Sequence, residues 1–389
     1  MSAKTNANVT CQAGDGRTDF LSRASVCVVK VGSGVLTGPD GLNLEVIASL
    51  ARDIAALMED GRQVILVSSG AVASGMRKLG LAKKPSLVRE KQATAAVGQG
   101  ALIRQYEKAF ETHGRKVAQI LLTRYDLVRR VHYLNARNTL KTLLSWGILP
   151  IINENDTVAV DELKFGDNDN LSAMIAHLLD ADLWVNLTDI DGLYTADPRV
   201  NKHAKRLETV ANVDRSVEDM ADAAPGAVNT GGMASKVAAA KKVTQAGIPA
   251  VIASGKNPGT LPALLAGESV GTFFVPRAGR MKSRKCWIAY ALKPKGELFL
   301  DAGAADAVTK KGKSLLPIGI VAVSGDFKEG DPVEIKDPSG ETIAVGLSSF
   351  PADDVRAIMG KPSREIARIL GEKLHDEVVH RDNLAVTCI

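Results

Sequence analysis

The chain lacks the cysteine spacing of a metal-binding or disulfide-bonded fold. Its four cysteines are scattered over 389 residues without a CxxC pair, at Cys11, Cys27, Cys286 and Cys388. This spacing argues against a zinc ribbon and against a disulfide framework. It fits a reducing compartment, and we therefore expect a cytoplasmic protein.

Long apolar runs are missing as well. No apolar stretch reaches the length of about 18 residues that a membrane-spanning helix needs. Residues 1–24 lack the apolar core of a signal peptide, and they are rich in Ser, Thr, Asn, Gly and Asp. We therefore expect no membrane association, and we expect residues 1–24 to form a disordered leader.

The chain also lacks a strong excess of charge of one sign. Its 49 Lys and Arg residues against 44 Asp and Glu residues give a net charge of +5, which is small for this length. Composition alone therefore gives no reason to expect a polyanionic partner. The apolar fraction of 45% and the charged fraction of 24% are ordinary for a globular protein, and the length allows two domains with a large core.

What the chain does have is a dense group of carboxylates and amides in the segment 153–173. This segment directly follows the apolar run Ile148–Ile152, which predicts a buried strand. Open α/β sheets bind ligands in the crevice beyond the carboxyl ends of their strands, so the segment is a candidate binding site. An Asx-rich hairpin loop is the alternative, because Asp and Asn are common turn formers.

Two earlier strands also end in small polar residues. Val26–Val31 leads into Gly32-Ser33-Gly34, where Lys30 and a flexible backbone could hold an anion, although a strand lysine is more often simply exposed. Thr37 stands where a dinucleotide fingerprint needs its third glycine. The strand Gln63–Val67 leads into Ser68–Ala71, where free amides at a helix start favour a carboxylate or phosphate. The alternative is that Ser69 only caps the helix.

A later pair of segments repeats this pattern. Leu183–Leu187 predicts a buried strand that ends at Thr188 and Asp189. Asn229–Lys236 contains two adjacent glycines and runs into a helical stretch. Backbone amides, the helix dipole and the charge of Lys236 could together hold a phosphate there, whereas a flexible loop that caps the helix is the alternative.

The order of elements predicts the fold class. Helical patterns at 44–60, 86–112, 133–146 and 168–179 alternate with apolar strands, which predicts an α/β domain with a mostly parallel sheet sandwiched by helices. Arg277–Lys285 is basic and contains glycine, so we expect a linker there. From about Gly296 onward, short β-like runs separated by Gly and Asp turns indicate a small β-barrel-like domain.

Taken together, these stretches resemble the glutamate 5-kinase family, which has an amino-acid-kinase fold and a C-terminal PUA domain. The resemblance rests on Val29–Gly32, Val67–Ala71, Asn153–Ala173, Leu187–Tyr194 and Thr230–Lys236, in the order of the family. Together with the composition of the two tails, which lie outside the resemblance, it divides the chain into five parts. These are a leader at 1–24, a kinase domain at 25–276, a linker at 277–292, a PUA domain at 293–373 and a polar tail at 374–389.

The resemblance also implies roles for individual residues. Lys30, Lys236 and Asp169 would act in phosphoryl transfer, and Ser69, Asp156 and Asn168 would bind glutamate. The ATP-binding residues would be Lys30, Thr188, Asp189, Thr230, Gly231, Gly232, Met233, Ala234, Ser235 and Lys236. No metal ligand is expected from the protein, since Mg²⁺ would be carried by ATP.

The reaction that the resemblance implies is the ATP-dependent phosphorylation of the side chain of L-glutamate, the first step of proline biosynthesis. A glutamate side chain has a reference pKa of about 4.3, so it is already ionised at neutral pH and needs no general base. Feedback inhibition by proline, a homotetramer and hand-over of the product to glutamate-5-semialdehyde dehydrogenase are further implications of the resemblance.

Two other functions remain open from the sequence. The same fold could phosphorylate another acceptor, such as aspartate, acetylglutamate, carbamate or a nucleoside monophosphate; the last would want arginines around its phosphate, and the segment 153–173 contains none. The chain could instead bind RNA through the PUA domain. Between Lys293 and Lys373, however, there are 12 Lys and Arg residues and 13 Asp and Glu residues. The domain therefore lacks the basic character that nucleic-acid binding requires.

Overall fold

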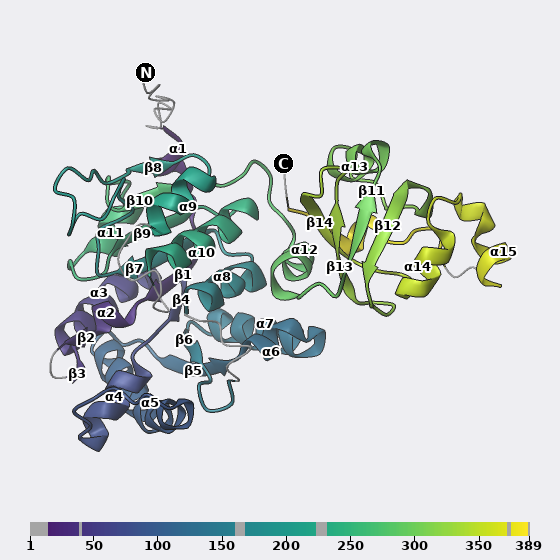
Figure 1. The fold of residues 1–389 in the computed structure, drawn as a ribbon. Coiled ribbons are helices and arrows are strands. Elements are labelled where there is room, and N and C mark those ends of the chain that lie inside the picture. Colours follow the sequence, from purple (N-terminus) through teal and green to yellow (C-terminus); the bar gives the residue numbers. More distant parts are fainter. Residues whose placement is uncertain (1–14, 39–40, 160–167, 223–231, 372–374, 388–389) are drawn as a thin grey trace. The chain divides into compact units, whose positions relative to one another are not determined.

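The computed structural model describes residues 15–38, 41–159, 168–222, 232–371 and 375–387. The chain divides into two compact units, Met1–Arg280 and Met281–Ile389. Figure 1 shows the elements of each unit. Each unit has its own sheet and its own hydrophobic core.

The first unit is built on an eight-stranded sheet with the order β5-β6-β4-β1-β7-β9-β10-β8. Only the pairing of β9 with β10 is antiparallel among the described strands of this sheet. The strands are β1 (Val26–Val31), β4 (Gln63–Val67), β5 (Val117–Leu122), β6 (Leu149–Glu154), β7 (Leu183–Thr188), β8 (Thr209–Val210), β9 (Ala250–Ser254) and β10 (Thr272–Phe274), and β2 (Thr37–Gly38) pairs separately with β3 (Gly41–Leu42). The predicted, mostly parallel sheet is therefore confirmed.

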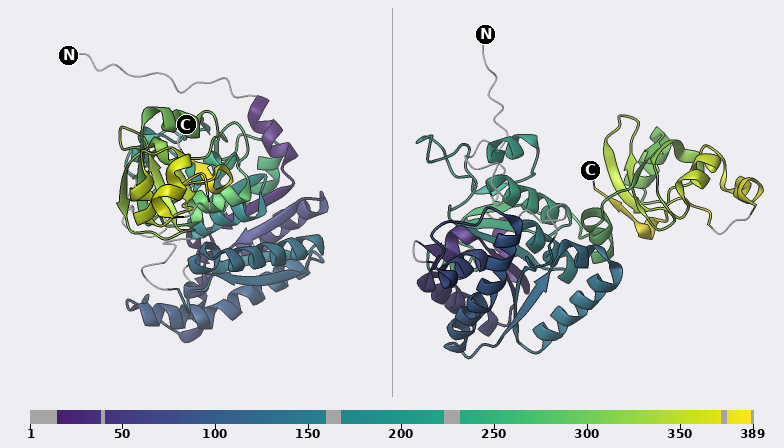
Figure 2. Two further views of the ribbon diagram at one scale, coloured as in Figure 1. Left: turned by 90° about the vertical axis from the view of Figure 1, so that its right-hand side faces the viewer. Right: turned by 60° about the horizontal axis from the view of Figure 1, so that its bottom comes forward.

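Helices cover both faces of this sheet (Figures 1 and 2). They are α1 (Asp15–Arg23), α2 (Ser33–Leu36), α3 (Leu44–Glu59), α4 (Ala71–Leu79), α5 (Val88–Glu111), α6 (Arg124–Val128), α7 (Arg130–Ser145), α8 (Asn168–Leu179), α9 (Arg215–Asp222), α10 (Met233–Gln245) and α11 (Thr260–Leu265). Helices α3, α5 and α11 share one core with alternate residues of the strands. Helices α8 and α10 pack against the opposite face, on β1, β7 and β9.

Strands β1 and β7 lie side by side in the middle of the sheet, and nearly all of their residues are buried. Strands of a parallel sheet that is covered on both faces are expected to be almost entirely apolar. Lys30 and Asn186 depart from this rule, and they are direct neighbours across the β1–β7 pairing. Since side chains alternate along a strand, both point to the face that α8 covers.

Helices α4 and α5 approach each other unusually closely, which explains two of their glycines. A Cβ at Gly98 of α5 would lie 1.9 Å from the carbonyl oxygen of Ala71, and one at Gly75 of α4 would lie 1.8 Å from that of Thr94. No side chain fits at such distances, so glycine at both positions permits the contact. The contact fixes the start of α4, which borders the site described below.

The expectation of a disordered leader is wrong for residues 15–24. Residues 15–23 form helix α1, in which Leu21 is fully buried. Arg17 is only 7% exposed and donates to the backbone carbonyls of Glu268 and Val270. The segment was predicted to be disordered because most of its residues are polar, and the few residues that anchor it give no pattern in the sequence. Residues 1–14 lie outside the described residues.

The second unit contains a five-stranded sheet with the order β12-β11-β13-β14-β15. Its strands are β11 (Gly296–Leu300), β12 (Ile320–Gly325), β13 (Pro332–Lys336), β14 (Thr342–Leu347) and β15 (Leu384–Val386), and its α-helices are α12 (Ser283–Cys286), α13 (Ala302–Thr309), α14 (Ala352–Ile358) and α15 (Ile366–Leu370). The predicted β-rich C-terminal domain is confirmed. Its helices were not predicted, because short helices carry little periodic signal.

Two expected boundaries of this unit are wrong. The segment 277–292, expected to be a solvated linker, contains α12 and a π-helix at Trp287–Ala291, and it buries Cys286, Trp287 and Ile288. The segment 374–389, expected to be a polar tail, contributes β15 to the sheet and buries Val378 and Val379 in the core. The linker prediction rested on the basic residues of 277–285 and overlooked the apolar run Cys286–Leu292, whereas the apolar residues of 374–389 are few and separated by polar ones.

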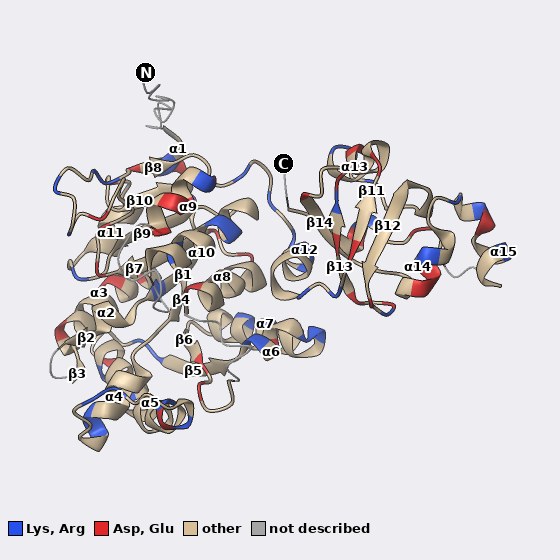
Figure 3. Cartoon of the chain, viewed as in Figure 1, with Lys and Arg blue, Asp and Glu red and all other residues tan. Residues whose placement is uncertain are grey.

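Acidic and basic residues are interspersed over the described parts of the second unit (Figure 3). Several form pairs, such as Lys336 with Glu297 at 2.6 Å and Lys295 with Asp331 at 2.7 Å. In neither unit is any described helix both long and apolar enough to cross a bilayer.

Candidate functional site

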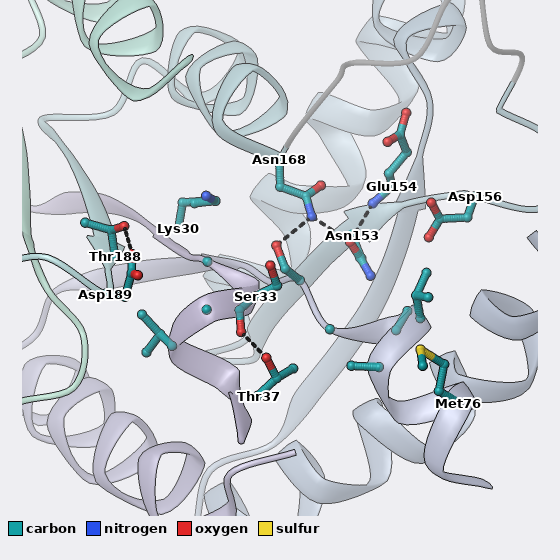
Figure 4. Close-up of a pocket in the computed structure, with 18 of the residues that line it drawn as sticks. Lys30, Ser33, Thr37, Met76, Asn153, Glu154, Asp156, Asn168, Thr188 and Asp189 are labelled. Atoms are coloured by element: carbon teal, nitrogen blue, oxygen red, sulfur yellow. Dashed lines mark hydrogen bonds between the residues drawn. The ribbon is translucent and has the colours of Figure 1, made fainter. Parts of the chain in front are cut away.

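The carboxyl ends of β1, β4, β6 and β7 meet at a cavity of about 400 Å³ (Figure 4). The first strand β1 has β4 on one side and β7 on the other, so the cavity lies where the strand order reverses. Open α/β sheets bind ligands at such points. The lining residues are Lys30, Gly32–Val35, Thr37, Ser69–Ala73, Met76, Lys84, Asn153, Glu154, Asp156, Asn168, Thr188, Asp189 and Lys236.

Two lysines from distant parts of the chain meet at one carboxylate beside this cavity. Lys30 comes from β1 and Lys236 from the first turns of α10, and both are ion-paired with Asp169 in the first turn of α8. Lys30 Nζ contacts Asp169 Oδ1, and Lys236 Nζ lies 3.4 Å from Oδ2. The three residues are between 0% and 5% exposed. Two ammonium groups and one carboxylate leave this group with a net charge of +1.

Each oxygen of the Asp169 carboxylate also accepts a hydrogen bond from a neutral donor. Asn186 Nδ2 donates to Oδ1 over 2.7 Å, and Ser235 Oγ donates to Oδ2 over 2.8 Å. Burial disfavours ionisation of this carboxyl, but the charges of Lys30 and Lys236 and the hydrogen bonds from Lys30 and Ser235 outweigh it and hold the pKa of Asp169 well below its usual range. Asp169 is therefore ionised throughout the physiological pH range.

A network of amides forms the wall next to this group. Asn168 Nδ2 lies 2.8 Å from the carbonyl oxygen of Ser68, 3.0 Å from Ser69 Oγ and 3.0 Å from Asn153 Oδ1. Asn153 Nδ2 in turn donates to Gln99 Oε1 on α5 over 3.1 Å. These acceptors fix the orientation of the Asn168 amide, and its buried Oδ1 has no hydrogen-bond partner among the residues that the structure describes. An unsatisfied acceptor beside a cavity suits a ligand that donates, such as an ammonium group.

The start of α4 forms the floor of the cavity. Its N-cap is Gly70, which makes no side-chain capping bond and has a φ of 101°, a conformation that favours glycine. Ser69 Oγ accepts from Asn168 and does not cap the helix, so the capping alternative for Ser69 is wrong. The first backbone amides of α4 therefore border the cavity and favour a bound anion.

The cavity has two chemically different ends (Figure 4). Thr188 and Asp189, joined by a hydrogen bond of 3.1 Å, lie at one end, and Asp156 lies at the other with Met76. Lys30 and Asn168 stand between these ends. The cavity can therefore hold two ligands, with the lysine amines close to where they meet.

Comparisons with known proteins identify the fold family. The model of the amino acid kinase family matches residues 25–254, which is more than half of the chain, and that of the PUA domain matches residues 296–370. The chain belongs to the amino acid kinase family. It is 50% identical to a glutamate 5-kinase from Syntrophotalea carbinolica over 95% of this chain and 99% of that relative. It is 51% identical to a glutamate 5-kinase from Moorella thermoacetica over 94% of this chain and 97% of that relative.

A weaker similarity is found to a solved structure, carbamate kinase from Giardia lamblia bound to AMP-PNP. The identity is 18% and the TM-score is 0.49, over 66% of this chain and 100% of that one.

Most of the site residues expected from the sequence come together in this amino acid kinase. Lys30, Lys236, Ser69, Asp156, Asn168, Thr188 and Asp189 all line the cavity, and Asp169 lies directly behind its wall. Ser235 reaches the same carboxylate. Gly232, Met233 and Ala234 form the start of α10 and are not among the described residues that line the cavity, and Thr230 and Gly231 lie outside the described residues.

Sequence reasoning missed several residues of this kinase site. Asn186 binds Asp169, Gln99 binds Asn153, and Met76 and Lys84 line the cavity. Asn186 carried a usable signal, because it is a polar residue within the apolar run Leu183–Leu187 of a buried strand. Gln99, Met76 and Lys84 lie in segments of ordinary helix or loop composition, where nothing distinguished them from exposed residues.

Proposed function

We propose that the chain is a glutamate 5-kinase, which transfers the γ-phosphoryl group of ATP to the side-chain carboxylate of L-glutamate as the first step of proline biosynthesis. The observation that carries this proposal is the meeting of Lys30 and Lys236 at Asp169, between the two ends of one cavity. The names of the relatives, which match over nearly their whole length, support the choice of acceptor.

The nucleotide would bind at the end marked by Thr188 and Asp189. A Cβ built at Gly32 would lie 3.7 Å from Lys30 Nζ, so the glycine loop and this amine are close enough to contact the same phosphate group. Lys236 and the N-terminus of α10 add positive charge from another side. Mg²⁺, carried by the nucleotide, would neutralise charge on the β and γ phosphates.

The chemistry then depends on positioning and charge. The acceptor carboxylate is ionised at neutral pH and attacks without a general base. The barrier comes from bringing an anion to an anion and from the charge that spreads over the transferred group. Lys30 and Lys236 would neutralise that charge from two sides, while Asp169 keeps both amines in place.

Glutamate would bind at the opposite end of the cavity. Its ammonium group would donate to Asp156 and to the unsatisfied Oδ1 of Asn168. The amides at the start of α4 and Ser69 would bind its α-carboxylate. This arrangement directs the side-chain carboxylate towards the lysines. Inhibition by proline, a homotetramer, hand-over to glutamate-5-semialdehyde dehydrogenase and a cytoplasmic location belong to the same proposal and rest on family resemblance alone.

A coupled assay of ADP release tests the proposed function. We expect ADP release that depends on L-glutamate, with an acyl phosphate that hydroxylamine traps as the hydroxamate. Aspartate, acetylglutamate, carbamate and UMP are the comparison acceptors. A preference for any of these over glutamate would replace the proposed acceptor, and proline added to the same assay would report the proposed inhibition.

Asp156→Asn tests the acceptor end of the cavity. A hydrogen bond to a charged group contributes about 1.5–3 kcal/mol, so we expect the KM for glutamate to rise by roughly ten- to a hundred-fold. The KM for ATP should stay within about twofold, because Asp156 lies away from Thr188 and Asp189. Asp60→Asn, at the exposed end of α3, is the matched control and should change neither constant. An unchanged KM for glutamate in Asp156→Asn would rule out its contact with the ammonium group.

A further inference from the structure

Asn186 is a buried polar residue to which the reaction described above gives no role. It is 0% exposed, in the middle of β7 between Val185 and Leu187, both of them core residues. Its Nδ2 donates to Asp169 Oδ1 over 2.7 Å, but its Oδ1 is buried and finds no hydrogen-bond partner in the described part of the chain. A buried unsatisfied carbonyl oxygen is costly, so Asn186 is not explained by stability.

The placement of Asn186 connects it to the lysine that it accompanies. Lys30 and Asn186 are paired residues of β1 and β7, on the same face of the sheet, and both reach Asp169 Oδ1. On the other oxygen, Lys236 is accompanied by Ser235, its neighbour on α10. Each carboxylate oxygen thus has one charged donor and one neutral donor.

The two kinds of donor behave differently when an anion enters the cavity. A lysine has a long flexible chain, and its ammonium group can turn towards a phosphate. The amide of Asn186 is on a short chain in the middle of a packed sheet. The hydroxyl of Ser235 is also on a short chain, and it shares its one hydrogen between Asp169 Oδ2 and the carbonyl oxygen of Gly232, each 2.8 Å away. The neutral donors can therefore hold the carboxylate in place while the amines move.

We propose that Asn186 is a positioning residue of the phosphoryl-transfer centre, which with Ser235 keeps the Asp169 carboxylate fixed between Lys30 and Lys236 when these amines engage the nucleotide. The proposal rests on the proposed function, since it assumes a phosphate at the lysine amines. Asn186 itself touches no substrate. It acts through Asp169, so its loss should affect turnover more than substrate binding.

Asn186→Leu tests the proposal, because leucine fits an apolar strand and removes both the donor and the unsatisfied acceptor. We expect kcat to fall about tenfold, with KM for ATP and glutamate changed less than about threefold. The melting temperature should be unchanged or higher, since an unsatisfied buried oxygen is gone. Thr244→Val is the matched control; it removes a buried hydroxyl of α10 that donates only to the backbone carbonyls of Ala240 and Lys241, and it should leave kcat unchanged.

The pH dependence separates positioning from a merely structural role. The charged groups that face Asp169 are Lys30 from β1 and Lys236 from α10, and both favour its ionised form. The folded-state pKa of Asp169 is depressed, so its contribution to stability is present above the unfolded-state pKa and is lost as pH falls through the folded-state pKa. Without the hydrogen bond of Asn186 that pKa is less depressed. The folded-state and unfolded-state pKa values of Asp169 are then closer together, so the melting temperature of Asn186→Leu should fall less on acidification than that of the wild type.

The outcomes are distinct. Wild-type kcat in Asn186→Leu would overturn the proposal, as would a loss of kcat that only parallels a lower melting temperature. If the leucine variant does not fold, Asn186→Ala takes its place in these measurements. If the wild type shows no turnover that depends on glutamate, the proposed function fails, and the role of Asn186 is then decided by the pH dependence of the melting temperature alone. Equal acid-side falls in wild type and variant would overturn that role, and a smaller fall in the variant would support it.

Discussion

Replacing Lys236 by alanine is expected to lower kcat by roughly a hundred- to a thousand-fold while the fold stays intact. Removal of one preorganised charge donor from a water-excluded site costs about 3–4 kcal/mol of transition-state stabilisation. Lys236 is 5% exposed, so bulk water cannot replace its amine without reorganisation of the site. The measurement is kcat for ADP release that depends on glutamate, together with the far-UV circular dichroism spectrum.

Lys241→Ala is the matched control for this variant. Lys241 lies on the same helix, α10, but pairs with Glu218 at 2.6 Å, and both side chains are substantially exposed. Its removal should change kcat by less than twofold. A Lys236→Ala enzyme that retained more than about half of the wild-type activity would refute the proposed role of this lysine.

Asp169→Asn is expected to destabilise the protein as well as inactivate it. The substitution removes the carboxylate to which two buried ammonium groups are ion-paired. Breaking a buried ion pair from one side costs about 3–5 kcal/mol. We expect about 3 kcal/mol, the lower end, because both lysines also line the cavity and can regain water there. Urea unfolding at pH 7 and at fixed protein concentration measures this loss, and kcat should fall by more than about a hundred-fold.

An aspartate–arginine pair elsewhere in the same unit calibrates that result. Asp180 pairs with Arg137 at 2.7 Å near the surface, where the side chains are 40% and 25% exposed. Asp180 also has a φ of 54°, a conformation that Asn tolerates well, so Asp180→Asn introduces no backbone strain. We expect a loss of about 1 kcal/mol or less. Equal losses for Asp169→Asn and Asp180→Asn would mean that Asp169 does not hold the two lysines.

The residues that were found from the sequence share one property. Lys30, Ser69 and Thr188 all lie at or just after the ends of apolar runs, and strand ends are visible in a hydrophobicity pattern. The parallel arrangement of the strands then brings those ends to one edge of the sheet. Lys236 was found because two glycines and a helix start precede it. Local sequence was sufficient for these positions, because the fold class fixes where strand ends meet.

Other features could not be predicted because they depend on contacts between distant segments. No local pattern says that Asn186 reaches Asp169, or that Gln99 orients Asn153. Helix α1 is held by two residues. Arg17 donates to backbone carbonyls far along the chain, and Leu21 packs into a core built from distant segments. Residues 281–292 and the described residues 375–387 are ordered for the same reason, through contacts and burial in the second unit. Composition describes a segment alone, whereas burial depends on what packs against it.

A crystal structure of the protein with AMP-PNP, Mg²⁺ and L-glutamate tests the central claim most directly. We predict that the amines of both Lys30 and Lys236 lie within hydrogen-bond distance of the γ-phosphate, with the glutamate ammonium at Asp156 and Asn168. A nucleotide whose terminal phosphate lies out of reach of either amine would contradict the account.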